Sequence, residues 1–123
     1  MIGQANNVFI FPGLGLGALV AETRAITDRM FLLAARTLAD AVTPERRATG
    51  ALYPPAADLR AVSRDIALAV AREAIEQGLA AIAPASDADL EAMVDAAMWW
   101  PAYVPYELDE QTEQNGRRRV IDR

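Results

Sequence analysis

The sequence predicts an α/β polypeptide that is mainly helical, with one buried strand of the parallel type followed by about four to five helices. Two observations lead to this prediction. The apolar run Val8–Phe11 lies between Asn6-Asn7 and Pro12-Gly13, and an unbroken apolar run between turn residues is typical of a strand covered on both faces. Most of the chain after it, as far as about Met98, has helical apolar spacing and helix-capping residues. The combination is typical of the last stretch of a doubly wound domain.

The predicted strand stands alone in the sequence. No second segment of the same kind occurs in the chain. A single strand cannot satisfy its own backbone N–H and C=O groups. We therefore expect its neighbours to come from upstream sequence or from another polypeptide, which would pair with its exposed edge.

A glycine run, Gly13, Gly15 and Gly17, follows the predicted strand. It is expected to form a tight turn that opens into a short helix. Backbone N–H groups at such a turn can cradle a phosphate, but the dinucleotide fingerprint is G-x-G-x-x-G, whereas the spacing here is G-x-G-x-G. Close packing of the helix start on the sheet is therefore the favoured interpretation.

Capping residues divide the rest of the chain into helices. The longest predicted helix has an apolar inner stripe and an outer face that includes Arg72 and Glu73. Residues 99–106 contain both tryptophans and two prolines and are predicted to form an extended arm, and 107–123 a polar, disordered tail. The predicted helix limits are Thr27 to about Val42, Thr43 to Gly50, Asp58 to Gly78, and Ser86 to Met98.

The composition of the chain excludes several kinds of catalytic chemistry. The 123-residue chain is long enough for one domain, and it has a net charge of −5, no Cys, no His and 12 basic residues, all of them Arg. Thiolate, imidazole and lysine-amine mechanisms are therefore unavailable to it. The acidic balance argues against nucleic-acid binding. Neither a signal peptide nor a membrane-spanning run is visible, so the cytoplasm is the expected location.

Two clusters could suggest ligand sites. Asp87, Asp89, Glu91 and Asp95 are acidic, but their spacing is typical of a solvated helix face rather than of a metal-binding loop. Asn6 and Asn7 could bind a ligand with carboxylate and hydroxyl groups, because a carboxamide both donates and accepts hydrogen bonds. Taken alone, the asparagine pair is more typical of a turn.

A family resemblance changes the interpretation of Asn6 and Asn7. The segment G-Q-A-N-N-V-F-I-F-P-G-L-G-L-G over residues 3–17 and L-Y-P-P over residues 52–55 resemble the C-terminal part of the malic enzymes. Weaker matches follow in the expected order, and the bacterial members look closest. These weaker matches are Ile26-Thr27-Asp28, Arg60 with Val62-Ser63, and Trp100-Pro101 with Tyr103.

The resemblance implies a specific activity for the parent enzyme. Malic enzymes convert malate to pyruvate and CO2 with NAD or NADP and Mg²⁺ or Mn²⁺. By the match, Asn6 and Asn7 would bind substrate, with Asn6 the better candidate, and Asn7 would also lie near the nicotinamide. Ala5 stands where the family has Gly. The parent enzyme is expected to be an oligomer.

The family's catalytic tyrosine and lysine, its metal ligands and its main dinucleotide fingerprint lie upstream of the matching segment. No catalytic or metal-binding residue is therefore assigned here, and the whole chain lacks Lys. Residues 1–106 are expected to be the C-terminal segment of a Rossmann-like NAD(P)-binding domain, inactive by itself. The alternative is a non-catalytic interaction module or gene remnant, which would pair with a separate polypeptide through the strand edge.

Overall fold

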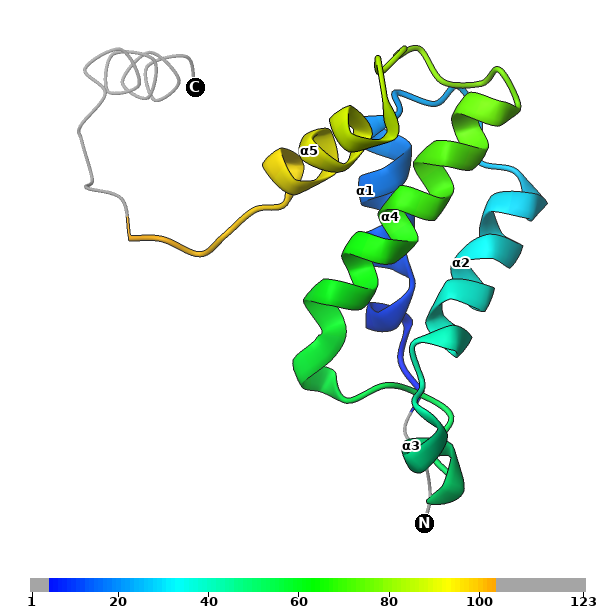
Figure 1. Cartoon of the computed structure of the whole chain (residues 1–123), viewed down its shortest axis with the longest axis vertical. Coiled ribbons are helices and arrows are strands. Elements are labelled where there is room, and N and C mark those ends of the chain that lie inside the picture. Colours follow the sequence, from blue (N-terminus) through cyan, green and yellow to red (C-terminus); the bar gives the residue numbers. More distant parts are fainter. Residues whose placement is uncertain (1–4, 104–123) are drawn as a thin grey trace, which may run out of the picture.

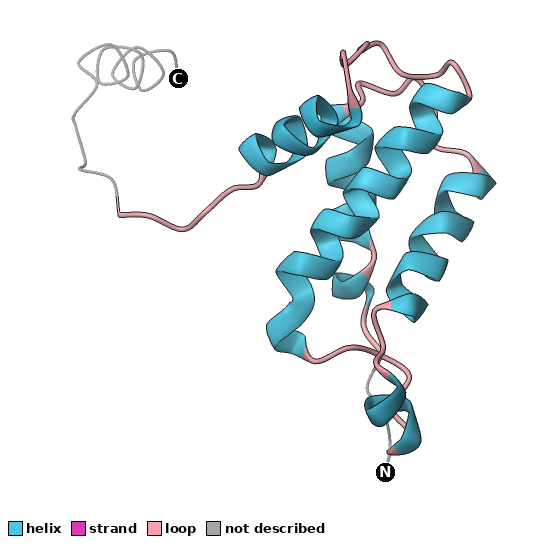
Figure 2. Ribbon diagram, viewed as in Figure 1, coloured by secondary structure: helices cyan, strands magenta, loops and turns pink. Residues whose placement is uncertain are grey.

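The computed structural model describes residues 5–103, and these form a helical bundle (Figures 1 and 2). No strand occurs among them, and none of their helices is long and apolar enough to cross a membrane. The predicted tail 107–123 and the end of the predicted arm lie outside the described residues. The elements are η1 (Asn7–Phe9), α1 (Phe11–Val20), α2 (Asp28–Asp40), α3 (Pro44–Ala48), η2 (Ala56–Asp58), α4 (Leu59–Glu76) and α5 (Asp87–Ala97).

The strand predicted over Val8–Phe11 is wrong, because these residues form a 3-10 turn and the start of α1. The side chain of Asn6 accepts a hydrogen bond from the backbone N–H of Val8, and the N–H groups of Phe9 and Ile10 bond to carbonyls three residues back. Pro12 lies at the start of α1, where its missing N–H is not needed. The backbone thus satisfies itself locally, and these residues present no strand edge.

Helix α1 packs closely against α4, which crosses in front of it in Figure 1. A Cβ atom added at Gly13 would lie 2.6 Å from the Ser63 carbonyl oxygen, and one at Gly17 would lie 2.5 Å from that of Ala67. No side chain fits at such distances. The glycine run therefore serves close packing, as predicted, but its partner is a helix rather than a sheet.

Helix α2 packs along another side of α4 (Figure 1). Thr27 caps its N-terminus as predicted, and Met30, Ala34 and Leu38 form its buried stripe. Glu73 of α4 is buried here, with an exposed fraction of only 3%, and its carboxylate pairs with Arg29 at 2.9 Å. Its predicted place on the outer face is therefore wrong, because a helix packed on two sides buries more than one stripe.

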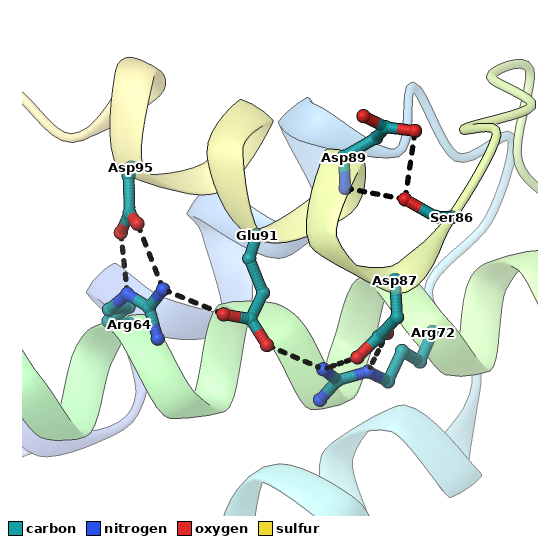
Figure 3. A network of polar contacts seen from close by, with 7 residues as sticks. All are labelled: Arg64, Arg72, Ser86, Asp87, Asp89, Glu91 and Asp95. Atoms are coloured by element: carbon teal, nitrogen blue, oxygen red, sulfur yellow. Dashed lines mark hydrogen bonds and ion pairs between the residues drawn. The ribbon is translucent and has the colours of Figure 1, made fainter.

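Helix α5 is attached to α4 by buried apolar residues and by a surface network of ion pairs (Figure 3). Leu90 and Val94 are its buried residues, and Ser86 caps its N-terminus as predicted. Arg64 pairs with Asp95, and Arg72 pairs with Asp87. Glu91 lies between the two arginines and contacts both, at 3.3 and 3.5 Å.

These ion pairs shift the pKa of their members. Hydrogen bonds from Arg72 and Arg64 hold the pKa of Asp87 and Asp95, respectively, below the ordinary aspartate value. The same hydrogen bonds raise the pKa of both arginines. The network is exposed to solvent, so each pair contributes little by itself.

Residues 99–103 follow α5 without regular secondary structure. The guanidinium of Arg60 donates to the carbonyl oxygen of Trp99 at 2.7 Å and lies 3.8 Å from the ring centre of Trp100. Both tryptophan side chains remain largely exposed. Arginine stacking thus fixes the start of this segment on α4 while leaving most of its aromatic surface uncovered.

Substitutions in the glycine run test the packing of α1 on α4. Gly13→Ala and Gly17→Ala should each destabilise the fold by about 1–3 kcal/mol, because the added methyl group overpacks the contact. Gly15→Ala is the matched control, since nothing lies within 4 Å of its Cβ position. It should stabilise the helix by about 0.5–1 kcal/mol. Urea unfolding measures all three, and equal effects at the three positions would contradict the packing.

Acid titration tests the network between α4 and α5. Because the pKa of Asp87 and Asp95 is lowered in the folded chain, their stabilisation is complete above the unfolded-state pKa of about 3.9. It is lost as the pH falls through the lower folded-state values. The double variant Asp87→Asn/Asp95→Asn should melt at a lower temperature near neutral pH and lose less stability on acidification. Asp65→Asn, outside the network, should follow the wild-type profile, and identical profiles for all three proteins would refute the role of the pairs.

Candidate functional site

Asn6 and Asn7 lie at the N-terminal end of α1, where the chain enters the bundle. Asn6 precedes η1, and its side-chain oxygen accepts the N–H of Val8 at 2.9 Å. That bond fixes the carboxamide and leaves its NH2 group available to a ligand. Both asparagines are exposed, but of the two only Asn6 lines the neighbouring pocket.

The pocket beside Asn6 has a volume of about 310 Å³. One wall comes from η1, and the other comes from α3 and the segment that leads into α4. The two walls are far apart in sequence and meet because the loop through Tyr53 and the buried Pro54 returns to η1. The residues around the pocket are Asn6, Val8, Phe9, Arg46, Tyr53, Pro54, Ala56 and Leu59.

Arg46 is the cation of this pocket, and no motif in the sequence singled it out. Its Nε donates to the carbonyl oxygen of Tyr53 at 2.6 Å, which holds the half-buried side chain in place. The ring centres of Tyr53 and Phe9 lie 5.6 Å apart, so these two side chains pack together and connect the two walls. The nearby cap of α3, where Thr43 accepts the N–H of Arg46, fixes the backbone from which this arginine projects.

The pocket has the polar groups needed to hold a small anion. Its carboxamide donates neutral hydrogen bonds, and the outer N–H groups of its guanidinium can take one carboxylate in a bidentate manner. Neither an aspartate nor a glutamate is among the residues around it. The arrangement therefore fits binding of a carboxylate and supplies no carboxylate base for moving a proton.

The acidic residues of α5 and the glycine run of α1 were the other candidate ligand-binding features, and neither forms a cofactor site within residues 5–103. No three of their His, Cys, Asp and Glu residues gather where they could hold a metal ion. Asp87, Glu91 and Asp95 form ion pairs with arginine instead. Gly13 and Gly17 face α4, so they are not open to a phosphate group.

Comparison with known proteins supports the resemblance to the malic enzymes. The family model described as "Malic enzyme, NAD binding domain" matches residues 1–75. The chain is 42% identical over 105 residues to the NAD-dependent malic enzyme of Psychromonas ingrahamii, covering 85% of this chain and 18% of that protein. It is 44% identical over 101 residues to the NADP-dependent malic enzyme 3 of Arabidopsis thaliana, covering 82% and 17%.

The chain spans less than a fifth of the length of these relatives. The family match nevertheless includes η1, the glycine run and most of α4, and it covers more than half of the 123 residues. The matched region thus contains both walls of the pocket beside Asn6. On these matches, the chain belongs to the malic enzyme family and corresponds to part of its NAD-binding domain.

Proposed function

We propose that this chain forms part of the malate pocket of a malic enzyme, which oxidises and decarboxylates malate to pyruvate with NAD or NADP. The observation that supports this proposal most directly is the pairing of Asn6 with Arg46 across one pocket. Malate carries two carboxylates and a hydroxyl, which are the groups that a carboxamide and a guanidinium bind. The family membership and the NAD-dependent relatives support the reaction.

In this proposal the chain binds and orients the substrate. The Asn6 NH2 group donates to a malate oxygen, and Arg46 holds a carboxylate from the opposite wall. Asn7, which begins η1 beside the pocket, contributes to substrate binding and lies toward the nicotinamide. A bound NAD or NADP would supply the hydride acceptor for the oxidation of malate. The groups that move protons and hold Mg²⁺ or Mn²⁺ belong to the rest of the enzyme, so no catalytic residue is assigned here.

A second proposal is a non-catalytic interaction module, or a gene remnant, that pairs with a separate polypeptide. Its original basis, an exposed strand edge at Val8–Phe11, is absent because these residues are helical or in a 3-10 turn. A different observation favours it, namely that Phe11 and Leu19 on α1 are more than half exposed. The two proposals are compatible, since a chain that supplies part of a pocket must also meet the part that completes it.

Substitution of Asn6 tests the substrate role. Asn6→Asp retains the oxygen that caps Val8 but removes the NH2 donor and adds a negative charge. It should weaken binding of L-malate to the full chain by about tenfold or more, the loss expected when a hydrogen bond to a charged group disappears. An NMR titration that follows the backbone amides measures this. Unchanged affinity in a folded Asn6→Asp chain would contradict the substrate role of Asn6.

Arg46 and Arg47 offer a matched pair of substitutions. Arg46→Met should lower malate affinity by about tenfold, because it removes the cation from the pocket. Arg47→Met changes the adjacent arginine, whose guanidinium bonds to the Ala39 carbonyl away from the pocket, and should leave the affinity near the wild-type value. Monomethyl malate, which lacks one negative charge, tests whether Arg46 recognises charge. Wild type and Arg47→Met should bind the dianion more tightly than the ester, whereas Arg46→Met should lose most of this preference. Equal losses in both variants would refute the role of Arg46.

A further inference from the structure

The composition of α1 differs from that of a surface helix. Over Phe11–Val20 every residue is apolar or glycine, with neither a charged nor a polar side chain. A helix that is apolar on all sides is typically covered on all sides. In α2 and α5, by contrast, charged residues such as Arg36 and Asp95 occupy the exposed side. The sequence of α1 is therefore that of a buried helix.

The structure covers only part of α1. Gly13, Leu14 and Gly17 are buried against the bundle, whereas Phe11 is 53% exposed and Leu19 is 78% exposed. Phe11, Gly15 and Leu19 follow each other at intervals of four residues, so they share one line along the helix. We call this line the open face of α1. Large apolar side chains on a helix without polar residues indicate a surface that another polypeptide covers.

Gly15, in the middle of the open face, supports the same conclusion independently. Gly13 and Gly17 are required where they are, because a Cβ atom would collide with α4. Nothing lies within 4 Å of a Cβ atom at Gly15, yet glycine inside a helix costs about 0.5–1 kcal/mol relative to alanine. Within residues 5–103, nothing requires this glycine. Close approach of a partner's backbone at Gly15 would require it.

The chain's relation to its relatives identifies the partner. More than four fifths of the Psychromonas ingrahamii enzyme lies outside the region that this chain matches. The family match extends over all of α1 and belongs to an NAD-binding domain. The open face has no charge, so it suits an apolar protein interior better than a nucleic acid or a charged ligand.

From these observations we infer that the open face of α1 packs against the remaining polypeptide of a malic-enzyme NAD-binding domain, with backbone approach at Gly15. This holds whether that polypeptide is joined to the chain or separate from it. The inference does not depend on malate binding by Asn6 or Arg46. Loss of the pocket's function and loss of this contact can therefore be distinguished.

A chimeric enzyme provides the test. In the Psychromonas ingrahamii enzyme, this chain replaces the segment that it matches. Single cysteines are introduced by Leu19→Cys, on the open face, and by Asp65→Cys, at an exposed charged position on α4. The isolated full chain contains no other cysteine, so the labelling of each site is measured there first. In the chimera, mass spectrometry locates the labelled site among the host's own residues.

Both cysteines should label readily in the isolated chain, and in the chimera only Asp65→Cys should remain reactive. Continued labelling of Leu19→Cys in a folded chimera would overturn the inference, as would a chimera that never becomes soluble. Protection of Leu19→Cys in the isolated chain that grows with protein concentration would also overturn it, because a second copy would then be the partner.

Gly15→Ala gives a second readout that a merely local effect would not produce. In the isolated chain this change should raise the melting temperature, because alanine favours the helix. In the chimera it should lower the melting temperature, because the methyl group meets the partner's backbone. An increase in both proteins would contradict close approach at Gly15.

Discussion

The close approach of α1 to α4 at Gly13 and Gly17 is the constraint on which the rest of the structure depends. Both glycines meet backbone carbonyls of α4 at distances that exclude a side chain. This contact sets the position of α1, and through it the position of η1 and Asn6 at its N-terminal end. At the other end, the N–H of Ala81 bonds to the carbonyl oxygen of Ala21 and ties the segment after α4 back to α1.

Helix ends could be predicted from the sequence because local chemistry determines them. Thr27, Thr43 and Ser86 each accept a backbone hydrogen bond within the first turn that follows them, and none of these bonds needs a distant partner. Gly78 has the positive φ of 65° expected just after a helix. At Asp58 the helix limit is confirmed, although its side chain makes no capping bond.

The errors arose where a pattern has two physical solutions. A short apolar run such as Val8–Phe11 fits a buried strand and a buried helix start equally well. Here the Asn6 cap and Pro12 at the first turn of α1 favour the helix. The burial of Glu73 follows from α2, which covers the side of α4 expected to face water. Arg46 could not be predicted as a site residue, because only the return of the Tyr53 loop brings it opposite Asn6.

The glycine run has two roles within about one and a half turns of helix α1. Two of its members bring α1 onto α4, and the third leaves a space on the opposite side. At the N-terminal end of the same helix, the pocket of Asn6 and Arg46 offers donors for a carboxylate but neither Asp nor Glu as a base. The sequence also has no Lys, His or Cys, and on this basis we propose that the chain binds substrate while other residues of the enzyme carry out the chemical step.

Malate-dependent reduction of NAD or NADP by the purified 123-residue chain, with Mg²⁺ or Mn²⁺ present, tests this division of roles most directly. The expected result is no reduction above the protein-free rate at any chain concentration, even where NMR detects malate at the Asn6 pocket. Turnover that increases in proportion to the amount of chain, and that Asn6→Asp abolishes, would contradict it.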